Sequence, residues 1–99
     1  MAYTLPESIQ REIERTFAPE DVEYVRSQLA GRELPFERSG PVPRVHIAVL
    51  WLSKGDRKRF DYELQGACCD WRDTLVAAGL ENEDWREILR KKGVDCRDW

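Results

Sequence analysis

The chain has 99 residues, of which 41% are hydrophobic and 35% are charged, and its formal net charge is −3. This length supports one domain with one hydrophobic core and excludes a second core. The surplus of 19 acidic over 16 basic residues argues against a dedicated nucleic-acid-binding protein, which usually carries a basic surplus or a clustered basic face.

The start of the chain and its cysteines indicate a cytoplasmic protein. Residues 1–4 lead into a polar helix instead of the apolar core of a secretory signal. The longest apolar run, residues 47–52, is far shorter than the ~20 residues that span a bilayer, so we expect no membrane partner. The cysteines are odd in number and two are adjacent, which favours reduced thiols. They are Cys68, Cys69 and Cys96.

Residues 1–31 predict a hairpin of two helices. Thr4 and Glu7 form a capping-box pattern at the start of the first helix, which then carries apolar residues at every fourth position. Pro19 marks the first turn of the second helix. Gly31 is expected to end that helix in the left-handed conformation.

Residues 32–43 predict a connector between the hairpin and a helical core that spans residues 44–99. Its three prolines and its glycine oppose a regular helix. They are Pro35, Gly40, Pro41 and Pro43. We interpret the connector as an extended surface loop, and a segment that docks a partner is the alternative.

Residues 45–52 are apolar on nearly every side and rich in strand-favouring side chains. No other segment alternates like a strand, so we predict a buried central helix that ends at Gly55. The alternative is an edge strand that pairs between two copies of the chain.

Asp56 is expected to cap the next helix, on which Phe60, Leu64 and Cys68 form the buried stripe. Gly66 weakens this helix by about 1 kcal/mol relative to alanine. It marks either a close approach of two backbones or a tolerated cost.

The last part of the chain repeats itself at an offset of fourteen residues. Residues 70–75 read Asp-Trp-Arg-Asp-Thr-Leu and residues 84–89 read Asp-Trp-Arg-Glu-Ile-Leu, and each unit ends in a glycine followed by an apolar residue. The pattern predicts two stacked short helices, each capped by aspartate or, for the second, by Asn82, and each stopped by glycine. A third unit begins at Asp98 and Trp99. The whole chain therefore predicts an all-α fold, a compact array of about five or six short helices.

Three segments of the core, Arg44–Leu50, Lys54–Asp56 and Asp70–Leu75, resemble a pattern in small, uncharacterised bacterial helical proteins. The resemblance covers roughly residues 44–94. It implies a bacterial cytoplasmic origin, and it brings no activity, cofactor or catalytic residue with it.

A catalytic or metal site has weak support in this sequence, and we expect no cofactor and no metal. Cys68 or Cys69 could meet His46 and Asp70 in a thiol, imidazole and carboxylate trio, but no local signature supports one. A zinc site from the three cysteines and His46 has enough ligands but lacks the usual spacing.

The tryptophans are the candidate interaction residues, because tryptophan and arginine are enriched at binding hot spots. The set comprises Trp71, Arg72, Trp85, Arg86 and Trp99. Trp51 is expected in the core, and Trp99 must either dock on the domain or reach a partner. The leading hypothesis is a non-enzymatic interaction module, such as an adaptor, a regulator or a toxin-neutralising partner, that binds another protein or itself.

The sequence allows two other hypotheses about function. The first is a nucleic-acid-associated regulator that acts through residues 90–92 and a basic patch, although interleaved acids favour an ordinary solvated face and argue against a nucleic-acid partner. The patch comprises Lys54, Arg57, Lys58 and Arg59. The second is a thiol-dependent enzyme.

Overall fold

The computed structural model describes residues 5–31, 41–97 and 99. Six helices occur in these residues, and none of them lies in a strand. The helices are α1 (Glu7–Thr16), α2 (Pro19–Ala30), α3 (Val42–Ser53), α4 (Arg57–Cys69), α5 (Trp71–Ala78) and α6 (Trp85–Lys91). The predicted all-α fold of five or six short helices is confirmed.

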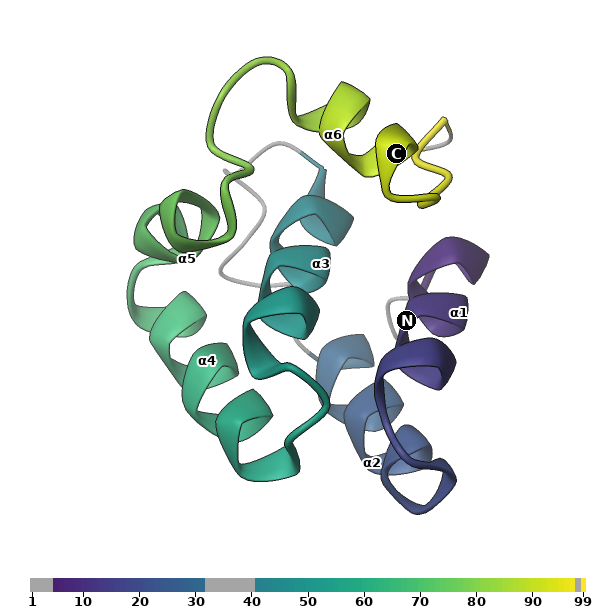
Figure 1. The fold of residues 1–99 in the computed structure, drawn as a ribbon. Helices are drawn as coiled ribbons and strands as arrows, with labels where there is room; N and C mark the ends of the chain where they lie inside the picture. Colours follow the sequence, from purple (N-terminus) through teal and green to yellow (C-terminus); the bar gives the residue numbers. More distant parts are fainter. Residues whose placement is uncertain (1–4, 32–40, 98) are drawn as a thin grey trace.

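Helix α3 runs through the centre of the molecule and contacts α1, α4 and α5 (Figure 1). Eight of its twelve residues are buried, because a helix that is apolar on every side has to be covered by other elements. The prediction of a central helix is confirmed, and the alternative of an edge strand is wrong. The helix begins at Val42, earlier than expected, because Pro43 fits the first turn, where a missing N–H is tolerated. Residues 32–40 of the predicted connector lie outside the described residues.

Helix α1 presents a stripe of apolar side chains to α3. Leu5, Ile9, Ile13 and Phe17 recur at every fourth position and are all buried. The capping box is wrong, because α1 begins at Glu7 itself, with Pro6 at the capping position and no side-chain cap. A glutamate in the first position of a helix cannot fill the third position that a capping box requires. Thr4 lies outside the described residues.

Helix α2 follows α1 after a short turn and packs against it, as the hairpin prediction requires (Figure 1). Pro19 occupies its first position, and Val25 and Leu29 are fully buried. Gly31 ends the helix, but its φ is −86°, so the expected left-handed stop is wrong. The Gly31 N–H instead continues the helical pattern by donating to the Ser27 carbonyl at 3.2 Å.

Two consecutive residues with positive φ end α3, because Lys54 has a φ of 53° and Gly55 a φ of 80°. The chain then enters α4, which Asp56 caps by accepting a hydrogen bond from the Lys58 N–H at 3.1 Å. The predicted cap is therefore confirmed.

The buried stripe of α4 departs from the prediction at its last position. Phe60, Leu64 and Ala67 are buried, whereas Cys68 is only half-buried. An α-helix turns about 100° per residue, so the position seven residues after Phe60 returns to within about 20° of it and the eighth lies about 80° away. Ala67 therefore takes the place that a four-residue spacing assigned to Cys68.

Gly66 lies on the exposed side of α4, and an added Cβ would meet no heavy atom within 4 Å. The interpretation of Gly66 as a close approach of two backbones is therefore wrong within the described residues. The glycine lowers the stability of the helix and is tolerated. We expect Gly66→Ala to raise the free energy of unfolding by about 1 kcal/mol, because alanine restricts the unfolded chain and favours the helix. Urea denaturation of both proteins measures the difference. A lower free energy of unfolding in Gly66→Ala would contradict the finding that no atom lies close to this position.

The fourteen-residue repeat is a repeat of helix endings, and the prediction that its two helices stack is wrong, because α5 packs on α3 and α4 and not on α6. Gly79 and Gly93 have φ values of 76° and 82°. The N–H of the residue after each glycine donates to a leucine carbonyl at 2.9 Å, in the pairs Leu80 to Leu75 and Val94 to Leu89. The glycine N–H groups donate to Val76 and Arg90 at 3.1 and 3.0 Å. Both endings are thus Schellman motifs in the same register.

The two helix beginnings differ. The Asp70 carboxylate caps α5 by accepting from the N–H groups of Arg72 and Asp73. Asp84 precedes α6 but makes no side-chain cap, and the Trp85 N–H donates to the Asn82 carbonyl instead. The expected cap of α6 is wrong because Asp84 has a φ of −84° and a ψ of 11°, not the extended backbone of a capping residue.

Candidate interaction surfaces

The four tryptophans have different environments. Trp85 is in the core and is 7% exposed, whereas Trp51, Trp71 and Trp99 are half-buried and pack against the core from outside. The two tryptophans that correspond in the repeat therefore differ, because Trp85 is covered by the end of the chain and Trp71 faces a hollow.

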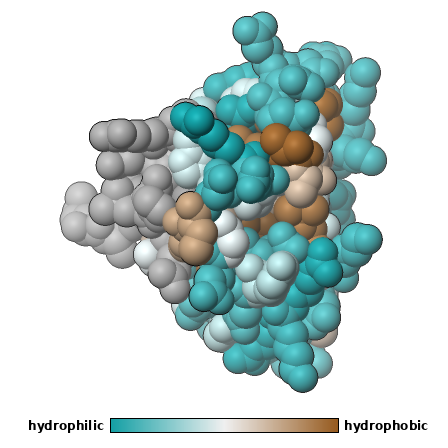
Figure 2. Space-filling view, turned by 90° about the vertical axis from the view of Figure 1, so that its left-hand side faces the viewer, coloured by the Kyte–Doolittle hydropathy of each residue, from teal (hydrophilic) through white to brown (hydrophobic). Residues whose placement is uncertain are grey.

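That hollow, of about 350 Å³, lies between α5 and the start of α3. Its lining consists of Arg44, Trp71, Arg72, Leu75, Val76 and Glu81. The Arg72 guanidinium lies over the Trp71 ring, 5.3 Å from its centroid. Val76 is 58% exposed and, with Tyr62, is one of two large apolar side chains that the described residues leave exposed. Figure 2 shows apolar residues on this side of the molecule within a largely hydrophilic surface.

A second hollow, of about 730 Å³, lies on the other side of α5 against α4. Its lining includes Tyr62, Gly66 and Ala77, and Tyr62 is 71% exposed. Helix α5 is therefore a ridge between two hollows. We call its outward residues, together with Tyr62, the α5 surface: Tyr62, Trp71, Arg72, Val76 and Ala77.

The wall of the first hollow is held by an arginine from α3. The Arg44 guanidinium donates two hydrogen bonds to the Leu80 carbonyl, at 2.9 and 2.6 Å, and lies 5.1 Å from the centroid of the Trp85 ring. Burial lowers the pKa of Arg44, and the attraction of Glu81 opposes this shift. The contact ties the turn after α5 to the central helix, so the hollow has a fixed wall.

Residues 70–85, which include α5 and the turn after it, carry an acidic surplus. They contain five carboxylates and one arginine, and all six of these side chains are exposed. The carboxylates belong to Asp70, Asp73, Glu81, Glu83 and Asp84. Asp70, Asp73 and Glu81 line the two hollows, together with arginines from α3 and α4. The negative surplus of this segment favours a partner of opposite charge.

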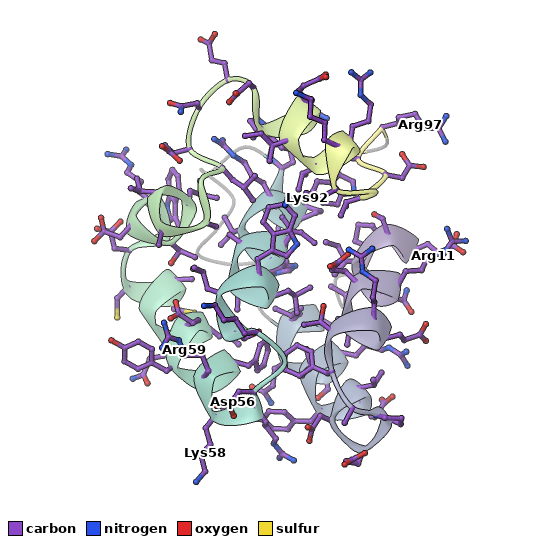
Figure 3. The ribbon with its side chains drawn as sticks, in the orientation of Figure 1. Arg11, Asp56, Lys58, Arg59, Lys92 and Arg97 are labelled. Atoms are coloured by element: carbon purple, nitrogen blue, oxygen red, sulfur yellow. The ribbon has the colours of Figure 1, made fainter. Side chains whose placement is uncertain are left out.

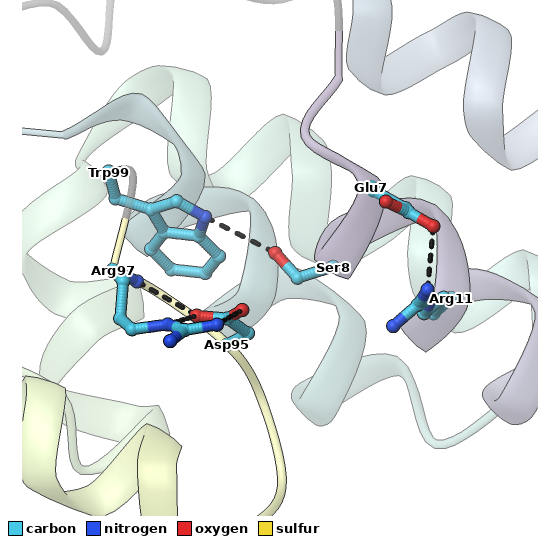
Figure 4. A network of polar contacts seen from close by, with 6 residues as sticks. All are labelled: Glu7, Ser8, Arg11, Asp95, Arg97 and Trp99. Atoms are coloured by element: carbon cyan, nitrogen blue, oxygen red, sulfur yellow. Dashed lines mark hydrogen bonds and ion pairs between the residues drawn. The ribbon is translucent and has the colours of Figure 1, made fainter.

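The end of the chain docks on the domain. The Trp99 ring stacks on Trp85 with centroids 6.3 Å apart, and its Nε1–H donates to the Ser8 hydroxyl at 3.3 Å (Figure 4). The Arg86 guanidinium lies over the Trp85 ring and donates to the carbonyls of Cys96 and Trp99 at 3.1 and 3.2 Å. Of the two roles expected for Trp99, the structure shows docking.

A third hollow, of about 570 Å³, lies beside this docked end, and we call it the C-terminal hollow. Its lining residues are Arg86, Glu87, Arg90, Gly93, Val94, Asp95, Cys96 and Arg97. Arg90 forms an ion pair with Glu87, and Arg97 forms one with Asp95 at 3.0 Å. Hydrogen bonds from Arg97 lower the pKa of Asp95 to about 2, so this carboxylate is charged at neutral pH.

The basic patch predicted at the start of α4 is largely engaged by carboxylates. Arg57 lies 3.8 Å from Asp21, and Arg59 lies 2.8 Å from Glu63. Lys58 projects away from the body of the protein (Figure 3), and Lys54 is exposed in the turn before it. The four bases of the patch therefore do not form one concave positive surface.

The candidate thiol and metal ligands have different environments. His46 is fully buried in α3, Cys68 is half-buried and Cys69 is exposed at the end of α4, and Cys96 is buried in the segment after α6. Within residues 5–31, 41–97 and 99, no group of three or more histidine, cysteine, aspartate or glutamate side chains is placed to hold a metal ion.

Comparisons with protein-family models, with curated proteins and with solved structures found no match for this chain. Among the helices of the described residues, none combines the length and the apolar character that a membrane crossing needs. The α5 surface and the C-terminal hollow are therefore the features from which a function can be inferred.

Proposed function

We propose that this chain is a non-enzymatic protein-interaction module that binds a basic segment of another protein on the α5 surface. The observation that carries the proposal is the exposed Val76 beside the half-buried Trp71 and a hollow of about 350 Å³. An apolar side chain of the partner would enter this hollow and cover Val76, which removes apolar area from water.

The acidic surplus of the segment that carries α5 supports a basic partner. Five exposed carboxylates and one exposed arginine occupy residues 70–85, so lysine or arginine side chains of the partner would meet opposite charge at Asp70, Asp73 and Glu81. Complementary charge accelerates association and selects partners. A module of this kind serves as an adaptor, a regulator or a neutralising partner, and Trp71 with Arg72 supplies the hot-spot residue types at its centre.

The experiment places a photo-crosslinking amino acid at Val76 in the full chain, expressed in the cell that naturally makes it. We expect one discrete adduct, whose partner carries a basic segment at the crosslinked position. Neutralising Asp73 and Glu81 together should reduce the yield, because both carboxylates border the α5 surface.

The matched control carries the crosslinker at Lys58, which is exposed on the neighbouring helix. The same adducts from both positions, or none from Val76, would contradict the proposal. An adduct of twice the chain's mass would identify a second copy as the occupant in place of another protein.

A further inference from the structure

Three guanidinium groups from residues 86–97 line the C-terminal hollow. Arg86 and Arg90 stand one turn apart on α6, and Arg97 comes from the segment that follows it. A smaller hollow of about 180 Å³ shares part of the same wall and adds Arg11 and Arg15 of α1. Figure 3 shows Arg11 of α1 and Arg97 on the same side of the molecule.

The local charge is opposite to that of the whole chain. Five arginines line the two hollows against three carboxylates, while the full sequence has a formal net charge of −3. The carboxylates are Glu12, Glu87 and Asp95. Lys91 and Lys92 follow Arg90 directly and are exposed. The dipole of α6 favours bases in its last turn, which accounts for Arg90 and Lys91 but not for the arginines on other elements.

Arg86 is the fixed cation of this group. Two of its N–H groups bond to the Cys96 and Trp99 carbonyls, and its plane lies over the Trp85 ring, 4.3 Å from the centroid. A guanidinium has five N–H donors, so three remain without a hydrogen bond to any described residue. It forms no ion pair with an aspartate or glutamate side chain of the described residues, and its orientation is set before any ligand arrives.

We propose that the C-terminal hollow binds the phosphate group of a small phosphorylated ligand. Its volume of about 570 Å³ lies within the range of ~300–1,000 Å³ that is usual for ligand sites. Phosphate oxygens accept paired N–H bonds from arginine, and a phosphate carries more charge than the Glu87 carboxylate that now holds Arg90. The ligand sits between Arg86 and Arg90 and displaces Glu87 from its exposed ion pair, which stabilises the fold very little.

The test is a titration of the full chain with pyrophosphate, followed by amide chemical shifts and by calorimetry. We expect saturable binding with the largest shifts at Gly93 and Asp95, which line the hollow. Arg90→Gln should weaken binding about tenfold, the loss of one charge-assisted hydrogen bond. Arg90 is exposed and pairs only with Glu87 among the described side chains, so this variant should fold normally.

Two further variants make the test specific. Glu87→Gln should tighten binding several-fold, because it removes the carboxylate that competes for Arg90. Arg59→Gln is the matched control, since Arg59 is an exposed arginine in a similar ion pair at the far end of the molecule (Figure 3), and it should leave the affinity unchanged. Unsaturable binding, equal losses for Arg90→Gln and Arg59→Gln, or weaker binding in Glu87→Gln would overturn the proposal.

A second arm distinguishes the sources of the phosphate group. A short single-stranded oligonucleotide is added to the complex with pyrophosphate. Competition that Arg90→Gln abolishes would show that the hollow binds a phosphodiester backbone, and would overturn the small phosphorylated ligand as its occupant. The absence of competition would support a free phosphorylated compound.

Discussion

Gly55→Ala is expected to destabilise the protein by roughly 2 to 5 kcal/mol, a large part of the stability of a small domain. Gly55 has a φ of 80°, which costs an L-residue about 1–2 kcal/mol. A Cβ at this position would also lie 2.6 Å from the Thr16 carbonyl oxygen. That atom is backbone at the end of α1, so the clash forces the turn between α3 and α4 away from the helix, at a cost of roughly 1–3 kcal/mol.

Gly79→Ala is the matched control for this prediction. Gly79 has a similar φ of 76°, but an added Cβ would meet no heavy atom within 4 Å. Its replacement should therefore cost only the left-handed backbone term, about 1–2 kcal/mol. Guanidinium denaturation of the two variants and the parent gives the free energies of unfolding. Equal losses at the two positions would mean that the contact between Gly55 and Thr16 contributes nothing.

The comparison of these glycines shows which parts of the fold a sequence can predict. Some starts and stops of helices could be assigned from the neighbouring residues alone, as at Asp56, Asp70 and Gly79. Others could not, since the capping box of α1, the left-handed stop of α2 and the side-chain cap of α6 were wrong. The contact of Gly55 with Thr16 joins residues 39 positions apart, and no local pattern marks it. The displacement of Cys68 by Ala67, in contrast, follows from the turn of about 100° per residue and could have been predicted from the spacing.

The candidate surfaces also differ in how far the sequence predicted them. The repeat drew attention to Trp71 and Arg72, and the structure places both at a hollow on α5. The C-terminal hollow was identified in part, because Arg86 was a candidate interaction residue and Arg90 belonged to the basic stretch of residues 90–92. The smaller hollow beside it was missed, since Arg11 pairs with Glu7 one turn away in α1 and so has an ordinary local explanation. The docking of Trp99 on Trp85 and Ser8 joins α6 to α1, and no local pattern marks that contact.

Trp85→Ala is expected to be the most damaging substitution among the tryptophans, with a loss of roughly 3 to 5 kcal/mol in the free energy of unfolding. The side chain is 7% exposed, and its removal would leave a cavity beneath the end of the chain. It would also remove the ring on which Trp99 stacks and over which Arg44 and Arg86 lie. Denaturant titration by circular dichroism measures the loss without relying on tryptophan fluorescence.

Trp71→Ala provides the control, because Trp71 occupies the equivalent position of the repeat. It is half-buried beside an open hollow, so less apolar area returns to water and no closed cavity forms. We expect a loss of about 1 to 2 kcal/mol, together with weaker crosslinking from Val76 if the α5 surface binds its partner as proposed. Equal losses at the two positions would mean that Trp85 gains nothing from the docked end. If Trp85→Ala loses more stability than Trp71→Ala but leaves the crosslinking from Val76 unchanged, the two tryptophans have different roles. Trp85 then stabilises the fold, and only Trp71 contacts the partner.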